Sequence, residues 1–157
     1  MYSRLLVALD GTETSQLALD HAACLARLAG ASVVLLHVLE TFRHISGFEP
    51  AEIYVHDVLP RMRESGRAIL DKAAARLRGE GIEVETILLE HTTERVSEAI
   101  VRLAGESHCD LVLLGTHGRR GMDRLLLGSD AEQVVRIAPV PVLLVRRPGN
   151  VQAANAG

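Results

Sequence analysis

The sequence predicts an α/β fold: a single doubly wound domain in which a five-stranded, mainly parallel sheet carries helices on both faces. Three observations lead to this prediction. The chain has 157 residues, a length that suits one domain. Five short apolar runs, typical of buried strands, alternate with four segments of helical periodicity. Strands that alternate with helices form parallel sheets, because right-handed crossovers connect them.

The first half of the chain predicts two strands and two helices. A strand over 3–9 ends at Asp10-Gly11, a helix over 12–29 stops at Gly30, and a second strand covers 33–38. An irregular stretch over 40–52 follows and is a candidate lid. The face expected to be buried on the first helix consists of Leu17, His21, Cys24, Leu25 and Leu28. The second helix ends at Gly79-Glu-Gly81 and carries a stripe made of Leu59, Met62, Gly66, Ile69, Leu70, Ala73 and Leu77.

The second half repeats this unit. We expect strands over 82–89, 110–115 and 140–145, a helix over 94–106, and a helix that begins with Ser129 as its N-cap. Pro141 cannot donate to a strand ladder, so the last strand is expected at an edge of the sheet. The domain is expected to span 1–147, and 148–157 to form a disordered tail. The buried faces of these two helices are Val96, Ala99, Ile100 and Leu103, and then Ala131, Val134, Val135 and Ala138.

Composition and charge exclude several classes of function. The net charge is −3, and the chain has no Trp, two Tyr and two Phe, so it has neither a basic field nor stacking platforms for nucleic acid. No apolar run reaches the length of a membrane span, and the N-terminus does not resemble a signal peptide, so we expect a cytoplasmic protein without a membrane partner. Cys24 and Cys109 are expected to be buried, and His37 and His21 to lie in or near the core. The histidines show no metal-ligand spacing.

The segment between the fourth strand and the last helix has the composition of a phosphate-binding loop. Gly115, Gly118 and Gly128 allow positive φ angles and a close approach of the backbone to a ligand. The free N–H groups and the dipole of the following helix attract an anion. The alternative is that the glycines serve only a turn and a helix start.

Positive charge near such a phosphate has to come from arginine. The one lysine, Lys72, lies in the middle of a helical segment, so the chain has no P-loop. Arg119, Arg120 and Arg124 lie between the second and third glycines, where they either clamp phosphate oxygens or form a solvated basic loop.

Several polar residues follow the predicted strands directly. Ligands of doubly wound sheets bind beyond the carboxyl ends of the strands, at a switch point in strand order. Asp10 after the first strand, Val38 at the end of the second and the 115–129 loop after the fourth are therefore expected to converge on one pocket. His117, inside the loop, is expected to hydrogen-bond a phosphate or a ribose.

From residue 2 to 147 the chain resembles the universal stress protein family, a set of cytosolic domains that bind adenine nucleotides. The nucleotide-binding branch is marked by G-x2-G-x9-G-[ST], which Gly115, Gly118, Gly128 and Ser129 match without a gap. The first strand of the family ends in an Asp followed by small hydroxylic residues, and Asp10-Gly-Thr-Glu-Thr-Ser15 is similar. The resemblance implies a Rossmann-like fold of the adenine nucleotide alpha hydrolase-like type.

The resemblance also implies a ligand and its contacts. The ligand is ATP, or else ADP or AMP, and family members are commonly homodimers whose last strands, here 140–145, pair. Asp10 is a candidate to help hold a Mg²⁺ that the nucleotide carries; alternatively it only caps the following helix, with Thr12 and Ser15 as competitors. Adenine, ribose and phosphates are expected to be bordered by Ala8, Asp10, Val38, Gly115, His117, Gly118, Gly128 and Ser129.

Asp130 departs from the family pattern, which more often has a small or apolar residue there. A carboxylate about 5 Å from a phosphate costs on the order of 3 kcal/mol at a dielectric constant of about 20, so Asp130 is expected to weaken ATP binding. The sequence therefore favours a homodimeric, nucleotide-binding stress-response or regulatory module that acts on an unidentified protein client. Two alternatives stay open: a slow Mg²⁺-dependent ATPase, and a nucleotide-independent adaptor that binds protein partners. No dedicated catalytic residue is expected.

Overall fold

The computed structural model describes residues 1–40, 54–90, 93–117 and 127–148. Within this part of the chain, five strands form one sheet in the order β3-β2-β1-β4-β5. All four neighbouring pairs are parallel, which confirms the predicted α/β class. The expected lid lies outside the described residues except for its first residue, and the expected tail except for Pro148. The strands are β1 (Arg4–Ala8), β2 (Ser32–Val38), β3 (Val84–Leu89), β4 (Leu111–Gly115) and β5 (Val142–Val145).

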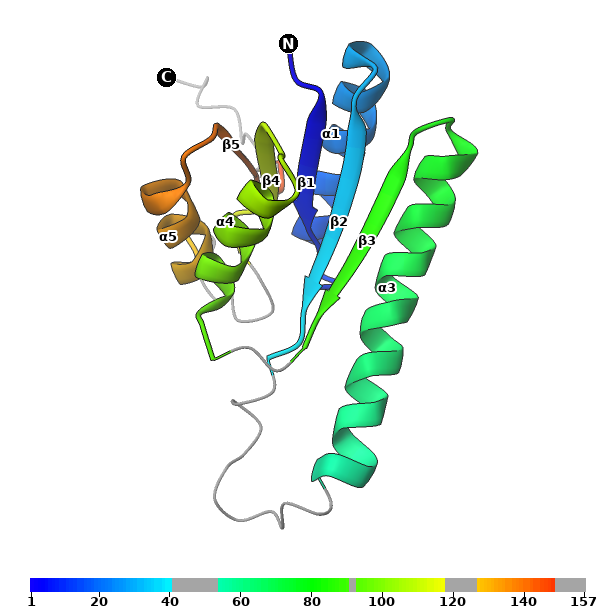
Figure 1. Ribbon diagram of the computed structural model, residues 1–157, viewed down its shortest axis with the longest axis vertical. Coiled ribbons are helices and arrows are strands. Elements are labelled where there is room, and N and C mark those ends of the chain that lie inside the picture. Colours follow the sequence, from blue (N-terminus) through cyan, green and yellow to red (C-terminus); the bar gives the residue numbers. More distant parts are fainter. Residues whose placement is uncertain (41–53, 91–92, 118–126, 149–157) are drawn as a thin grey trace, which may run out of the picture.

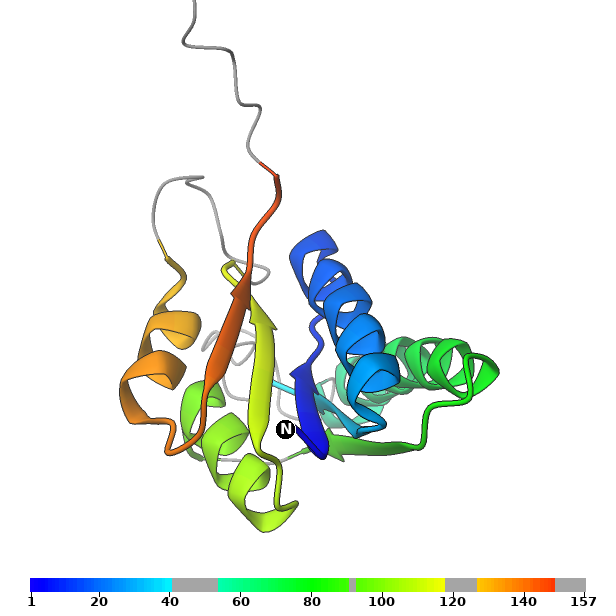
Figure 2. The ribbon, with the colours of Figure 1, turned by 90° about the horizontal axis from the view of Figure 1, so that it is seen from above.

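Helices cover both faces of the sheet, as Figures 1 and 2 show. On one face lie α1 (Glu13–Ala29) and α3 (Leu59–Gly79), and on the other lie α4 (Val96–Glu106) and α5 (Ser129–Ile137). Successive strand side chains point to opposite faces. In β1, Leu5 and Val7 pack under α1 and α3, whereas Leu6 packs under α4 and α5. Because both faces are covered, the central strands are mostly apolar.

Alanines form most of the contact between α1 and the sheet, contrary to the prediction. The buried residues of this helix include Ala18, Leu19, Ala22, Ala23 and Ala26. Of the residues expected there, Leu17 and Leu25 are partly buried, His21 and Cys24 are exposed, and Leu28 is 78% exposed. The prediction was wrong because it gave weight to large side chains, whereas small side chains let a helix backbone approach a sheet closely. The helix ends as predicted at Gly30, whose φ is 66°.

The long helix α3 buries the predicted stripe against β2 and β3. A π-helical turn, η2 (Tyr54–Val58), leads into α3, whose first part extends beyond the sheet (Figure 1). Gly66 lies over His37, because a Cβ at Gly66 would come within 2.8 Å of the His37 Cδ2 atom. His37 is buried, as predicted, and its Nδ1 lies 2.7 Å from the Leu9 carbonyl oxygen.

The last helix and strand differ from the prediction in detail. The N-cap of α5 is Gly128 and not Ser129, which is the first helical residue, and Gly128 offers no side chain to cap the helix. Val135, expected to be buried, is 50% exposed. β5 is an edge strand, as predicted, but it begins at Val142, after Pro141, and not at residue 140. No helix in the described part of the chain is long and apolar enough to cross a membrane.

Candidate functional site

The order of the strands creates a crevice between β1 and β4. The chain leaves β1 for α1 on one face of the sheet, whereas it leaves β4 for α5 on the opposite face. Ligands of such sheets bind at this switch point, outside the carboxyl ends of the strands. A cavity of about 250 Å³ lies there, with walls from the ends of β1, β2 and β4 and from the first turns of α4 and α5.

The structure brings together the predicted site residues that it describes. Gly118 and Arg119 lie outside the described residues, as do Arg120 and Arg124. The predicted residues that line the cavity are Ala8, Asp10, Val38, Gly115, His117, Gly128, Ser129 and Asp130.

Close packing explains two glycines of the motif. A Cβ at Gly115 would lie 2.7 Å from Thr14 Oγ1 and 2.8 Å from Thr14 Cβ, so α1 touches the end of β4 with no room for a side chain. A Cβ at Gly128 would lie 3.0 Å from the Thr116 carbonyl oxygen, to which the Gly128 N–H donates at 2.8 Å. Neither glycine has a positive φ. The prediction of a left-handed backbone is therefore wrong at these two glycines. In this structure the atoms that approach them closely belong to the protein: Thr14 at Gly115 and the Thr116 carbonyl oxygen at Gly128.

The first turn of α5 faces the cavity without a side-chain cap. Ser129 is exposed and Asp130 is half-buried, and both line the cavity. The first N–H groups of a helix have no acceptor inside the helix, so they attract an anion. Asp130 places a carboxylate beside these donors, which opposes an anionic ligand.

Asp10 is held at the cavity by the residue that caps α1. Thr12 is the N-cap, and its Oγ1 accepts from the Ser15 N–H at 3.3 Å. Asp10 Oδ1 accepts from the Thr12 N–H at 2.9 Å and from the Thr12 hydroxyl at 2.5 Å. Thr12, and not Asp10, therefore caps α1. Asp10 lies in the wall of the cavity.

Sequence reasoning missed the apolar wall of the cavity. Leu36, Val96, Ile100 and Leu114 line it beside the polar groups. Val96 and Ile100 were assigned only to a buried helix face, since a residue that faces a pocket and one that faces the core follow the same helical spacing. Apolar walls with a few converging polar groups are typical of sites for small molecules.

A second, larger cavity of about 650 Å³ adjoins the first between α4 and α5. Its wall includes Arg95 and Arg136, whereas the wall of the first cavity has neither Arg nor Lys among the described residues. Arg136 is bonded to Glu132 at 2.9 Å. The two cavities share Val38, Glu40, Val96, Ser129 and Asp130.

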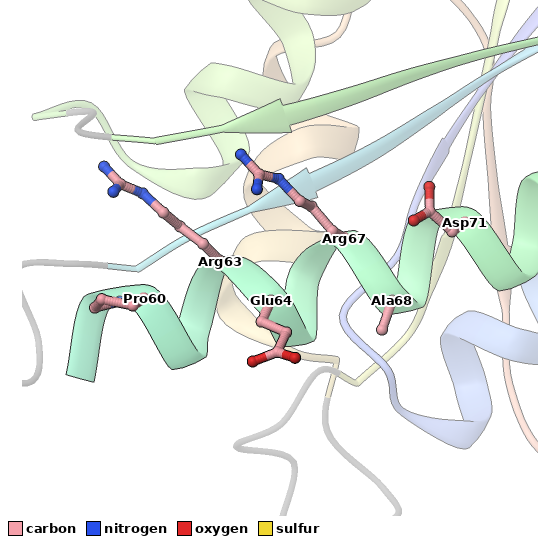
Figure 3. A pocket seen from close by; sticks show the side chains of 6 residues that line it. All are labelled: Pro60, Arg63, Glu64, Arg67, Ala68 and Asp71. Atoms are coloured by element: carbon pink, nitrogen blue, oxygen red, sulfur yellow. The ribbon is translucent and has the colours of Figure 1, made fainter. Parts of the chain in front are cut away.

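A third hollow, of about 600 Å³, lies along α3 alone (Figure 3). Pro60, Arg63, Glu64, Arg67 and Asp71 line it at helical spacing, and Figure 3 shows that no other element contributes a labelled side chain. Of these three hollows, the cavity at the switch point is the one on which residues from several strand ends converge.

The two cysteines differ in their surroundings. Cys109 is buried, as predicted, and burial raises the pKa of its thiol to about 11. Cys24 is exposed, which corrects the prediction for it. Within the described residues, no group of three or more His, Cys, Asp or Glu side chains is arranged to hold a metal ion.

Comparison with known proteins agrees with the fold. Residues 1–146 match the model of the universal stress protein family. Universal stress protein MJ0531 of Methanocaldococcus jannaschii is 30% identical over 148 residues, which cover 94% of this chain and 84% of that protein. The structure of MJ0577 from the same organism aligns with a TM-score of 0.82 and 28% identity, over 95% of this chain and 99% of that one. The universal stress protein from Archaeoglobus fulgidus in complex with dAMP aligns with a TM-score of 0.63 and 26% identity, over 92% and 98% of the two chains.

Proposed function

The chain belongs to the universal stress protein family, and we propose that it is a regulatory module that binds an adenine nucleotide, ATP in particular, in the cavity at the switch point. The observation that carries this proposal is the convergence of Asp10, Val38 and the two ends of the glycine loop, Gly115 and Gly128, on one cavity. The dAMP complex of the Archaeoglobus fulgidus relative supports an adenine nucleotide as the class of ligand.

The chemistry of the cavity wall suggests how the nucleotide lies. The base packs against Leu36, Val96 and Ile100, and it reaches the backbone of Val38. The ribose lies beside Asp10, whose carboxylate accepts from its hydroxyls. The phosphates lie at the N-terminus of α5, where the Ser129 hydroxyl and the first N–H groups of the helix donate to them.

The nucleotide brings its own cation in this proposal. Mg²⁺ is commonly bound by one or two carboxylates together with phosphate oxygens, and Asp10 and Asp130 both line the cavity. A Mg²⁺ held near Asp130 would offset the repulsion that this carboxylate otherwise imposes on the phosphates. The adjoining cavity gives a triphosphate more room than the 250 Å³ of the first cavity alone.

The unit that binds the nucleotide spans residues 1–147, and we propose that two copies pair through residues 140–145 in the cytoplasm. β5 is an edge strand, and its residues Val142, Leu143 and Leu144 are only partly buried within one chain. A partly exposed apolar edge is usually covered or paired. Nucleotide occupancy then alters a surface that a client protein reads.

Calorimetric titration of ATP into nucleotide-free protein, with Mg²⁺ present, tests the proposal. We expect saturable binding near one ATP per chain. Gly128→Val places side-chain atoms against the Thr116 carbonyl oxygen and should abolish binding. Gly105→Val is the matched control, because nothing lies within 4 Å of a Cβ built at that glycine. Retained affinity in Gly128→Val, or no binding by the unchanged protein at millimolar ATP, contradicts the proposal.

A slow ATPase is the competing function, and the same samples decide it. Turnover that needs Mg²⁺ and falls on Asp10→Ala identifies an enzyme, whereas ATP recovered unchanged after hours identifies a binding module.

A further inference from the structure

Thr14 connects α1 to the glycine loop without lining the cavity. Its side chain lies in the first turn of α1 and is 9% exposed. The Thr14 hydroxyl donates to the carbonyl oxygen of His117 at 2.5 Å, across 103 positions of sequence. His117 is the residue at which the described part of the chain enters the loop. The backbone at His117 is therefore held by a side chain that does not line the cavity.

A row of oxygen atoms continues from Thr14 to the ribose side of the cavity. Thr14 Oγ1 lies 3.2 Å from Thr12 Oγ1, and the Thr12 hydroxyl donates to Asp10 Oδ1 at 2.5 Å. We call the Asp10 carboxylate, the Thr12 and Thr14 hydroxyls and the His117 carbonyl the hydroxyl chain. Its two ends, Asp10 and His117, both line the cavity, whereas its two hydroxyls lie behind the wall. The chain thus joins the end of β1 to the end of β4.

Counting protons shows that the hydroxyl chain has two arrangements. Each threonine hydroxyl carries one proton. While Thr12 donates to Asp10 and Thr14 donates to His117, neither hydroxyl has a proton left for the 3.2 Å contact between them. Asp10 Oδ1 already accepts two hydrogen bonds from Thr12, so a ligand hydroxyl that donates to Oδ1 as well competes with the Thr12 hydroxyl, which can then turn and donate to Thr14. Donation to Thr14 then strengthens the bond from Thr14 to His117, because hydrogen bonds in a row polarise one another.

We propose that Thr14 is a positioning residue that couples recognition of the ribose hydroxyls at Asp10 to the position of the glycine loop at His117. This inference rests on the proposed function, since it takes a nucleotide as the ligand. It names the chemical feature of the ligand that sets the loop: a ribose with free hydroxyl groups. Thr14 acts through the His117 carbonyl and never through the ligand.

The test combines three variants with two nucleotides. Thr14→Val removes the hydroxyl and nearly keeps the shape, and Thr14→Ser restores the hydroxyl. Thr86→Val, at an exposed position on the far edge strand β3, controls for the chemical change. Each protein is titrated by calorimetry with ATP and with 2′,3′-dideoxy-ATP, which lacks the ribose hydroxyls.

We expect Thr14→Val to weaken ATP binding about tenfold, as loss of one hydrogen bond of ordinary strength does. Because only ATP engages the hydroxyl chain, the preference for ATP over the dideoxy nucleotide should shrink by up to about twofold in this variant. Thr14→Ser and Thr86→Val should behave like the unchanged protein. An equal loss for both nucleotides, or no loss for either, overturns the coupling.

Amide hydrogen exchange in the nucleotide-free protein separates this inference from the proposed function. The Gly128 N–H donates to the Thr116 carbonyl, beside His117, whereas the Thr116 N–H donates to Val145 in β5, both at 2.8 Å. Thr14→Val should speed exchange of the Gly128 amide about tenfold and leave the Thr116 amide unchanged. Unchanged exchange at Gly128 overturns the positioning role. If the unchanged protein binds no ATP, the proposed function fails and the coupling to ribose fails with it, while the exchange rates alone decide whether Thr14 positions the loop.

Discussion

Replacing Gly115 with alanine tests whether contact with α1 fixes the end of β4. The new Cβ would lie 2.7 Å from Thr14 Oγ1, 2.8 Å from Thr14 Cβ and 2.9 Å from the Thr14 backbone carbon. The last of these atoms belongs to the main chain, so a change of rotamer cannot relieve the overlap and α1 has to shift. Overpacking of this kind costs about 1–3 kcal/mol. A displaced Thr14 also loses its bond to His117, which contributes about 0.5–1.5 kcal/mol.

We therefore expect Gly115→Ala to lower the free energy of unfolding by about 1.5–4.5 kcal/mol, a loss that a domain of ordinary stability tolerates. Urea denaturation followed by circular dichroism measures it, and titration with ATP on the same sample should show weaker binding. Gly105→Ala provides a control of opposite sign. Gly105 lies in α4 with nothing within 4 Å of a built Cβ, so alanine should stabilise the protein by about 0.5–1 kcal/mol. If the free energy of unfolding of Gly115→Ala stays within about 0.5 kcal/mol of that of the unchanged protein, the contact with Thr14 relaxes without cost and the reasoning is wrong.

Three further predictions concern charge, assembly and thiol chemistry. Without Mg²⁺, Asp130→Asn should tighten ATP binding on the order of tenfold at low salt, and less as salt rises; unchanged affinity by calorimetry means that the carboxylate points away from the phosphates. Light scattering at micromolar concentration should give twice the chain mass of 17.0 kDa, and Leu144→Pro, which removes an edge N–H, should shift it towards one chain; a monomeric unchanged protein refutes pairing through β5. A maleimide at neutral pH should label Cys24 in the folded protein and Cys109 only in urea. Mass spectrometry of the labelled protein shows which cysteine has reacted. Burial raises the pKa of Cys109 from 9.0 to about 11, so the folded protein holds the thiol proton more tightly than the unfolded chain does. The free energy of unfolding should therefore fall as the pH rises from 9 towards 11.

The sequence alone predicts the order of the elements and the place of the cavity. Alternating apolar runs and helical stripes identify the strands, and the rule for ligands of doubly wound sheets places Asp10, Val38 and Gly115 together. These inferences succeed because they depend on periodicity and topology, which the order of residues determines. The structure agrees with them in the parallel pairing and in the residues that line the cavity.

Details that depend on distances across the fold could not be predicted. Nothing in the sequence indicates that Thr14 and His117 hydrogen-bond, because the two residues lie 103 positions apart. The role of Gly115 was assigned to backbone freedom, whereas the structure shows that the neighbouring helix leaves no room for a Cβ. Val96 and Ile100 could not be recognised as a pocket wall, since only the empty space beside them distinguishes a wall from a core.

The alanine face of α1 limits how this domain can change by mutation. Ala18, Ala22 and Ala26 are at most 2% exposed, and each already carries the smallest side chain that has a Cβ. Most replacements at these positions therefore add volume and push the helix away from the sheet, and glycine instead weakens the helix. A relative in which α1 lies farther from the sheet needs larger residues at these three positions. The size of these side chains should therefore correlate with the distance between α1 and the sheet. Because Thr14 begins the same helix, that separation should vary together with the shape of the cavity in such relatives.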